Sequence, residues 1–178
     1  TQNSMFANRI WTADGVIEIE GTGYWKKGKI SGITNQNELT LNRFFTAASV
    51  CSETVLHTDP NNEDKWKLIG NPTEAAILVA LHKYGMDVEN IRSQFELVKE
   101  IPFSSQTKSM TVLARNNRNC YYSDENILNF TKGNPGKVID RCSYLLKGGK
   151  VIEMSAEDKA DILAFNDEMA SKGYRLLA

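Results

Sequence analysis

Residues 127–142 read ILNFTKGNPGKVIDRC, and the pattern changes from strand to helix at the centre of this stretch. β-Favouring side chains lead up to Lys132 and Gly133, and Pro135 then begins a short helix over residues 135–142. Glycine lets a ligand approach the backbone, and a helix start offers unpaired N–H groups. The stretch therefore suits a flat, charged ligand such as a nucleotide. On its own, it is explained more simply as a strand, turn and helix with a solvated lysine.

Apolar, β-favouring runs precede this stretch and fill residues 95–131. Polar turns at residues 115–119 and 123–126 interrupt these runs, which predicts antiparallel strands in a sheet that carries the Lys132 loop. The sequence also predicts a strand over residues 16–20, a helix over 38–53, an exposed loop over 57–64, and helices that begin near residues 71 and 155. Because strands and helices do not alternate strictly, the predicted fold class is α+β.

The composition is that of one globular domain of ordinary size, with 178 residues that are 41% hydrophobic and 24% charged. The 21 basic and 22 acidic residues nearly cancel, which gives no electrostatic footprint for nucleic acid or for an anionic membrane. We therefore expect no nucleic-acid partner and no direct membrane contact. The sequence contains neither an apolar run of about 18 residues nor a secretory signal pattern.

Cysteine and histidine spacing argues against a disulfide framework and against a zinc site. Cys51, Cys120 and Cys142 are odd in number and far apart, which is typical of free thiols in a reducing compartment. His57 and His82 lie far from each other and from any cysteine pair. We expect no metal ligands among these residues and a cytosolic location for the domain.

A helix start at residues 71–74 leaves the role of one carboxylate open. Asn71 suits the N-cap, Pro72 suits the first helical position, and Gly85 suits the end of the helix. Glu74 stands where the carboxylate of a capping box reaches back to the N–H of the N-cap residue. From the residues alone, capping is the favoured role of Glu74, and contact with a ligand is the alternative.

Two further segments accompany residues 127–142 in a fixed order: residues 70–76 read GNPTEAA, and residues 101–113 read IPFSSQTKSMTVL. Together the three segments resemble the nucleotide-binding (N) domain of P-type ATPases, the ion pumps that pass through an aspartyl-phosphate. They are most similar to the type II group, which contains the calcium and sodium–potassium pumps. The resemblance implies a single nucleotide-binding domain over residues 1–178, built as an antiparallel β-sheet flanked by helices. Residues 1–5 and 173–178 resemble hinge segments that lead toward a phosphorylation domain.

The resemblance implies a site for ATP, bound as MgATP, formed by Glu74, Phe103, Lys108, Lys132, Gly133 and Arg175. Phe103 matches the aromatic residue that stacks on adenine, and Glu74 matches the acidic residue that approaches the adenine amino group. Without the resemblance, Phe103 is as readily a core residue. Stacking of a base on an aromatic side chain is worth about 1–3 kcal/mol.

Around the rest of the implied pocket, Lys108 and Lys132 match lysines that line the family's site, and Gly133 permits a close approach. Arg175 matches the arginine that reaches the phosphates, and its plain alternative is a solvated cation after a helix-ending glycine. The chain departs from the family at Ser105, where an arginine is usual. Because losing one charge-assisted hydrogen bond costs about 1.5–3 kcal/mol, we expect a modest affinity for ATP.

The resemblance also implies a place in a larger pump. There the domain would position the γ-phosphate of MgATP for transfer to an aspartate in the phosphorylation domain, and the actuator domain would be a further partner. The family's acceptor aspartate is expected just before Thr1, and no Asp of this chain lies in a D-K-T-G-T context. We therefore expect a cytoplasmic domain of an integral membrane protein that binds ATP without hydrolysing it, with no catalytic residue of its own.

Two other functional classes remain as alternatives. Residues 105–108 form an S-x-x-K sequence, the nucleophile motif of penicillin-binding proteins and serine β-lactamases, and Lys132-Gly133 is similar to their K-T-G. The middle motif would fall at residues 123–126, which carry an extra residue, and all the elements crowd into about 30 residues. We rank this acyltransferase hypothesis low. A non-catalytic interaction module would bind no nucleotide at all.

Overall fold

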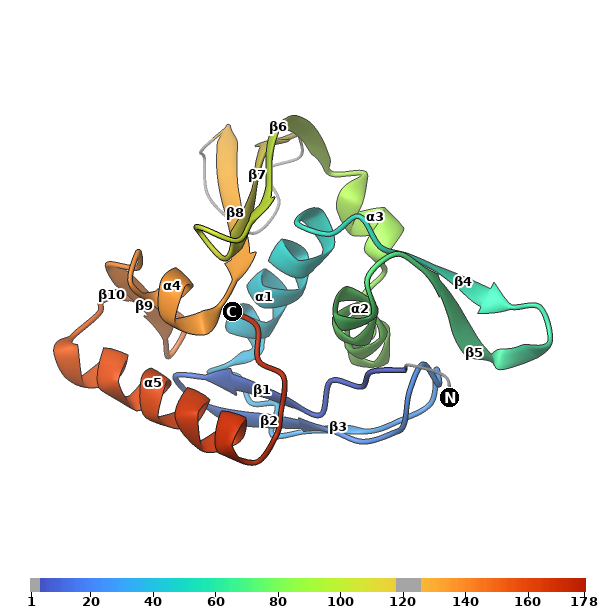
Figure 1. The fold of residues 1–178 in the computed structure, drawn as a ribbon, viewed down its shortest axis with the longest axis horizontal. Helices are drawn as coiled ribbons and strands as arrows, with labels where there is room; N and C mark the ends of the chain where they lie inside the picture. The colour runs from blue at the N-terminus through green and yellow to red at the C-terminus, as the bar shows by residue number, and fades with distance from the viewer. Residues whose placement is uncertain (1–3, 118–125) are drawn as a thin grey trace.

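The computed structural model describes residues 4–117 and 126–178, and Figure 1 shows their arrangement. The helices are α1 (Glu38–Val50), α2 (Pro72–Tyr84), α3 (Val88–Arg92), α4 (Pro135–Ile139) and α5 (Ala156–Ser171). The strands are β1 (Arg9–Thr12), β2 (Gly15–Ile19), β3 (Ile30–Ser31), β4 (Val55–Asp59), β5 (Asn62–Ile69), β6 (Phe95–Ser104), β7 (Ser109–Asn116), β8 (Ile127–Gly133), β9 (Tyr144–Lys147) and β10 (Lys150–Glu153). This mixture of helices and antiparallel strands confirms the predicted α+β class.

In the described part of the chain, the strands form several small antiparallel sheets rather than one. β1, β2 and β3 make one three-stranded sheet, β6, β7 and β8 make another, and β4-β5 and β9-β10 are hairpins. In the second sheet, Ser109 of β7 lies opposite both Ser104 of β6 and Gly133 of β8. This register brings the ends of β6 and β8, with Phe103 and Lys132, to the same end of the sheet.

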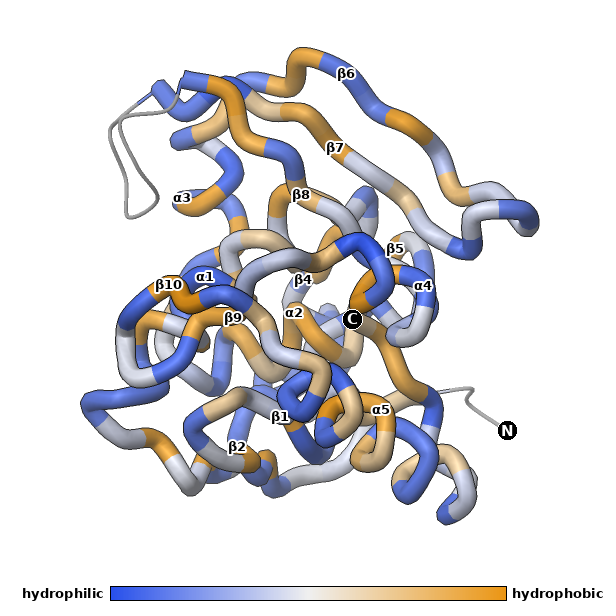
Figure 2. The backbone as a smooth tube through the Cα atoms, turned by 90° about the vertical axis from the view of Figure 1, so that its left-hand side faces the viewer, coloured by the Kyte–Doolittle hydropathy of each residue, from blue (hydrophilic) through white to orange (hydrophobic). Residues whose placement is uncertain are grey.

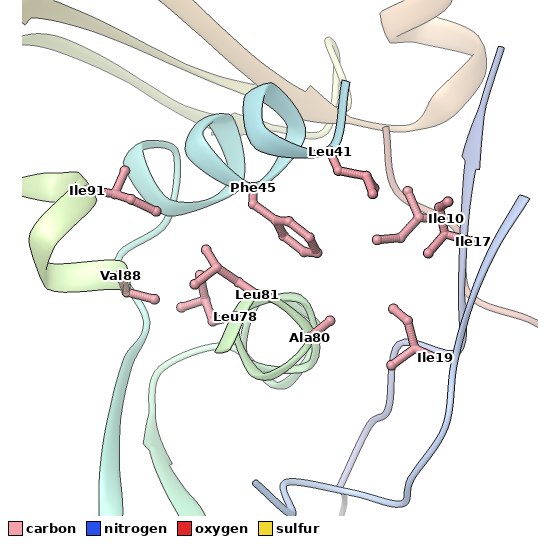
Figure 3. Packing of buried hydrophobic residues seen from close by; sticks show 10 residues of the cluster. All are labelled: Ile10, Ile17, Ile19, Leu41, Phe45, Leu78, Ala80, Leu81, Val88 and Ile91. Atoms are coloured by element: carbon pink, nitrogen blue, oxygen red, sulfur yellow. The ribbon is translucent and has the colours of Figure 1, made fainter. Parts of the chain in front are cut away.

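α1 and α2 lie between the two three-stranded sheets (Figure 1). The larger core joins α1, α2 and α3 to β1 and β2, and Figure 3 shows Phe45 of α1 facing Leu81 of α2 at its centre. Both side chains are no more than 1% exposed. A smaller core joins Cys51, just after α1, to β7 and to Phe130 of β8. α1 therefore packs against both sheets, and in the side view of Figure 2 β6 forms the outer edge of the upper one.

The prediction of an exposed loop over residues 57–64 is wrong. β4 and β5 form a hairpin there, and only Pro60 and Asn61 lie between the two strands. The Asn61 N–H donates to the carboxylate of Asp59 at 2.9 Å, which tightens the turn. The hairpin projects away from the helices (Figure 1), so its side chains are mostly polar and its composition is that of a loop. Pairing between the strands, rather than burial, determines this element.

The predicted helix starts near residues 71 and 155 and the predicted end at Gly85 are confirmed, whereas two helices are shorter than predicted: α1 ends at Val50 rather than at residue 53, and α4 ends at Ile139 rather than at residue 142. Asn71 accepts a backbone N–H of the first turn of α2 through its side chain, and Pro72 is the first residue of that helix. Gly85 follows α2 with φ 93°, a left-handed conformation that favours glycine. Ser155 begins α5 and shares a reciprocal capping box with Asp158.

The described cysteines are free thiols: Cys51 is buried and Cys142 is exposed, whereas Cys120 lies outside the described residues. Within residues 4–117 and 126–178, His, Cys, Asp and Glu side chains form no group that could hold a metal ion. No helix in these ranges is both long enough and apolar enough to cross a membrane.

We predict that Phe45→Ala lowers the free energy of unfolding by about 3–5 kcal/mol, because it leaves a cavity between α1 and α2. Phe103→Ala is the matched control, since the Phe103 side chain is 63% exposed and its loss opens no cavity. For the control we expect a change within about 0.5 kcal/mol. Urea unfolding followed by circular dichroism measures both values. Equal losses in the two variants would contradict the central place of Phe45 in the core.

Candidate functional site

A cleft of about 500 Å³ lies where α2, the sheet β6-β7-β8 and the segment after α5 meet. Its lining comes from the start of α2, the end of β6, the β6–β7 turn, the end of β8 and the C-terminal segment. All the site residues predicted from the sequence line this cleft: Glu74, Phe103, Lys108, Lys132, Gly133 and Arg175. The fold thus brings together side chains that are widely separated along the chain.

Glu74 and Lys132 form an ion pair within the cleft, and their side chains are only 15% and 17% exposed. The second carboxylate oxygen of Glu74 accepts hydrogen bonds from Ser52 Oγ at 2.8 Å and from Thr54 Oγ1 at 2.7 Å. Burial raises the pKa of Glu74, but the hydrogen bonds from Lys132, Thr54 and Ser52 outweigh burial and hold it below its ordinary value of 4.5. The group is therefore an ionised acceptor at neutral pH.

The capping-box role of Glu74 is not what the structure shows. The backbone N–H of Asn71, which a capping carboxylate would accept, donates instead to Thr54 Oγ1 at 2.9 Å. Asn71 caps the helix alone, through its side-chain oxygen and the N–H of Thr73 at 2.8 Å. Because Thr54 satisfies the N-cap N–H, the Glu74 carboxylate is available to Lys132 and to the cleft.

Phe103 lies at the end of β6 and is 63% exposed, so its alternative as a core residue is wrong. An aromatic ring of this size is normally covered by other side chains, whereas the Phe103 ring lines the open cleft. An exposed aromatic ring and a carboxylate acceptor in one cleft provide a face for stacking and an oxygen for a hydrogen-bond donor. This pairing suits a heteroaromatic ligand that carries an amino group.

The turn over residues 105–108 joins β6 to β7 and places Lys108 at the cleft. The Lys108 N–H donates to the Ser104 carbonyl at 2.8 Å, and Lys108 has a positive φ of 50°. Ser105 and Lys108 belong to this exposed turn, and no hydrogen bond joins their side chains among the described interactions. The S-x-x-K sequence thus lacks the contact that would activate a serine nucleophile, and residues 123–125 of its supposed middle motif lie outside the described residues.

Steric contacts within the fold require glycine at position 133. A Cβ at this position would overlap the Lys108 carbonyl oxygen and would lie 2.8 Å from Ser109 Cα. The Gly133 N–H also donates to the Ala178 carbonyl at 2.8 Å, and the Ala178 N–H donates back to the Gly133 carbonyl at 3.0 Å. The close approach that Gly133 permits in this structure is therefore between β8 and the start of β7.

Arg175 is exposed and lines the cleft together with Leu176 and Leu177, from the segment that follows α5. Figures 1 and 2 both show the end of this segment beside α4. Lys108, Lys132 and Arg175 give the cleft three cationic side chains, against the single carboxylate of Glu74. The lining therefore favours an anionic ligand.

Sequence reasoning missed Ser52 and Thr54, the hydroxyl donors to Glu74. They lie in a short loop between α1 and β4, about 20 residues before their partner in the chain. Serine and threonine in a loop are common, and nothing in their spacing distinguishes a donor to a buried carboxylate. Only the fold, which sets this loop against the start of α2, identifies them.

The low pKa of Glu74 predicts a pH-dependent contribution to stability. Because folding lowers this pKa below 4.5, the contribution is complete above that value and is lost as the pH falls through the folded-state pKa. Glu74→Gln should be less stable than the wild type at neutral pH and should lose less stability on acidification. Unfolding free energies measured from neutral to acidic pH check this, with Glu153→Gln on the exposed strand β10 as the control. Parallel curves for wild type and Glu74→Gln would contradict the ionised, hydrogen-bonded state of Glu74.

Comparison with known proteins identifies the family. Residues 40–178 match the family model described as P-type ATPase, cytoplasmic domain N. The chain is 30% identical over 181 residues to a calcium-transporting ATPase of Bacillus subtilis, an alignment that covers 100% of the chain and 19% of that protein. It is 30% identical to a probable cation-transporting ATPase F of Mycobacterium tuberculosis (100% and 19%) and 29% identical to the rat calcium-transporting ATPase type 2C member 2 (100% and 18%). The chain thus spans about a fifth of the length of these relatives. It belongs to the family of P-type ATPase cytoplasmic N domains.

Proposed function

We propose that this domain binds ATP, as MgATP, in the cleft lined by Glu74, Phe103, Lys108, Lys132, Gly133 and Arg175. The convergence of these residues on one cleft is the observation that carries the proposal. They come from segments that are widely separated along the chain, and an unrelated set of such residues would be scattered over the surface. The family supports the same conclusion, since the matched region is the N domain of P-type ATPases.

The base would lie against Phe103, whose exposed ring supplies the stacking face. Glu74, which is ionised at neutral pH, can accept a hydrogen bond from the exocyclic amino group of adenine. Guanine presents a carbonyl oxygen at that position, and a carboxylate repels it. Phe103 and Glu74 together therefore favour adenine over guanine nucleotides.

The phosphates would be balanced by the cationic side chains of Lys108, Lys132 and Arg175. Lys132 is tied to Glu74 in this structure, so it has to share or exchange this partner when it meets a phosphate. Ser105 also lines the cleft, in place of the usual arginine, and supplies a hydroxyl but no charge. We expect Mg²⁺ to be held mainly by the phosphates and by the neighbouring domain of the parent chain.

For the parent protein we propose ATP-driven transport of a cation, since similar proteins include calcium-transporting ATPases. This domain would position the γ-phosphate for transfer to an aspartate in the phosphorylation domain, and the actuator domain would complete the cycle. Residues 1–5 and 173–178 would serve as the hinges, although residues 1–3 lie outside the described structure. By itself the chain is expected to bind ATP without hydrolysing it.

A two-dimensional amide NMR titration with ATP tests the proposal. We predict saturable shifts that cluster at Glu74, Phe103, Lys108 and Lys132, with GTP and AMP as comparisons. A β-lactam serves as the probe of the acyltransferase alternative and should produce no shift at Ser105. Absence of any shift with nucleotides up to millimolar concentration would remove the ATP site and favour an interaction module.

Substitutions then measure how much individual side chains of the cleft contribute to ATP binding. Phe103→Ala should weaken ATP binding roughly ten- to a hundredfold, the equivalent of about 1–3 kcal/mol of lost stacking, and Lys132→Ala should weaken it as well. Tyr144→Ala is the matched control, because Tyr144 is an equally exposed aromatic residue (65%) on β9 that does not line the cleft. Lys150→Ala on the exposed strand β10 is the control for Lys132. Calorimetry measures all four, and full affinity in both cleft variants would refute the site.

A further inference from the structure

Behind Glu74 lies a short loop, residues 51–54, whose hydroxyl groups are oriented by backbone donors. Thr54 is fully buried (0% exposed), and its Oγ1 accepts the Asn71 N–H at 2.9 Å. Ser52 Oγ accepts the Thr54 N–H at 3.2 Å. A hydroxyl has one proton to donate, and an N–H at each oxygen directs that proton away from the donor. The nearest acceptor for both hydroxyl protons is the same oxygen, Oε2 of Glu74, which lies 2.8 Å from Ser52 Oγ and 2.7 Å from Thr54 Oγ1.

The backbone of this loop is fixed by a single side chain from α3. Arg92 Nε donates to the Ser49 carbonyl at 3.0 Å, and Nη2 donates to the carbonyls of Ser52 at 2.7 Å and Thr54 at 3.0 Å. Charge-assisted hydrogen bonds of this kind are about twice as strong as neutral ones. On the opposite side of Thr54, a Cβ on Gly70 would lie 2.9 Å from Thr54 Cα, so the two backbones are in close contact. The loop therefore cannot shift without breaking several contacts.

The two hydroxyls occupy one half of the Glu74 carboxylate. A carboxylate offers about four acceptor positions, two on each oxygen. Ser52 and Thr54 use both positions on Oε2, and Lys132 uses one position on Oε1. Among the described interactions, Oε1 is thus the oxygen with acceptor capacity left for a ligand in the cleft.

We propose that Ser52 and Thr54, held by Arg92, are positioning residues that saturate Oε2 of Glu74 and present Oε1 as the acceptor for the amino group of a bound adenine base. This inference rests on the proposed binding of ATP in the same cleft. It assigns selectivity for a 6-amino purine to residues that do not touch the ligand. Lys132 would then share Oε1 with the amino group or leave it for a phosphate.

The test compares ATP with inosine triphosphate, whose base carries a carbonyl in place of the amino group. Ser52→Ala and Thr54→Val each remove one donor, and we expect each to weaken ATP binding by about tenfold while changing the affinity for inosine triphosphate much less. The ATP preference should therefore fall in both variants. Thr54→Ser keeps the hydroxyl and should therefore retain the wild-type preference for ATP. Thr46→Val is the matched control, since its buried hydroxyl donates to the Asn42 carbonyl within α1 and lies outside the cleft.

A second readout does not need a nucleotide. Carbon-detected NMR titration of the Glu74 carboxyl should show a higher pKa in Ser52→Ala and Thr54→Val than in the wild type, because both hydrogen bonds favour the ionised form. Ser52 is only partly buried, so Ser52→Ala keeps the test valid if Thr54→Val fails to fold.

The outcomes separate this inference from the function on which it rests. Wild-type protein that binds ATP, with the same ATP preference and the same Glu74 pKa in both variants, overturns the positioning role and leaves the ATP site intact. Wild-type protein that binds neither nucleotide overturns the proposed function and the selectivity role together. Loss of ATP and inosine triphosphate affinity by equal factors shows a merely structural role for the loop and also overturns the inference.

Discussion

The carboxylate of Glu74 is the group on which the rest of the cleft depends. It joins the start of α2 to β8 through Lys132 and to the loop after α1 through Ser52 and Thr54. A partly buried charge is tolerated only when its oxygens are satisfied, and removal of one partner leaves the other uncompensated. The helical layer and the sheet β6-β7-β8, which also share the smaller apolar core, are thus joined at the cleft by an ionic contact that holds Lys132 of β8 against the start of α2.

The other ion pairs of the described residues are more exposed to solvent than Glu74–Lys132. Each has at least one side chain that is half exposed or more, as in Lys147–Asp158 at 50% and 19%. Such surface pairs contribute about 0–1 kcal/mol and are screened by salt. Glu74–Lys132 is the pair in the described chain in which both side chains are less than 20% exposed. Electrostatics therefore has its largest structural effect at the place where a charged ligand is expected.

Local signals predicted much of the fold, because helix caps and strand patterns are properties of neighbouring residues. Asn71, Gly85 and Ser155 mark helix ends as expected, and the antiparallel strands between residues 95 and 133 follow their β-favouring runs. The β4-β5 hairpin was missed because its strands are polar and project away from the core. The pattern of its side chains carried no burial signal, and only strand pairing defines it.

The site could be predicted only in part, and for a related reason. The residues that line the cleft were found by resemblance to a family, whereas spacing alone favoured a capping role for Glu74. That role was wrong because Thr54 Oγ1 accepts the Asn71 N–H, a tertiary contact across 17 positions in the chain. Likewise, the need for glycine at position 133 arises from the neighbouring strand β7. Contacts between distant segments decide the role of these residues, and no local pattern encodes them.

The paired hydrogen bonds between Gly133 and Ala178 have a mechanical consequence. Two antiparallel bonds resist a pull along the chain more than a single contact does, because they load together. Residues 175–177 form part of the cleft wall and lead directly to this anchor. A displacement of Ala178 is thus transmitted directly to Gly133, the residue next to Lys132. Any movement of the C-terminal segment would therefore change the wall of the cleft and the backbone next to Lys132 together.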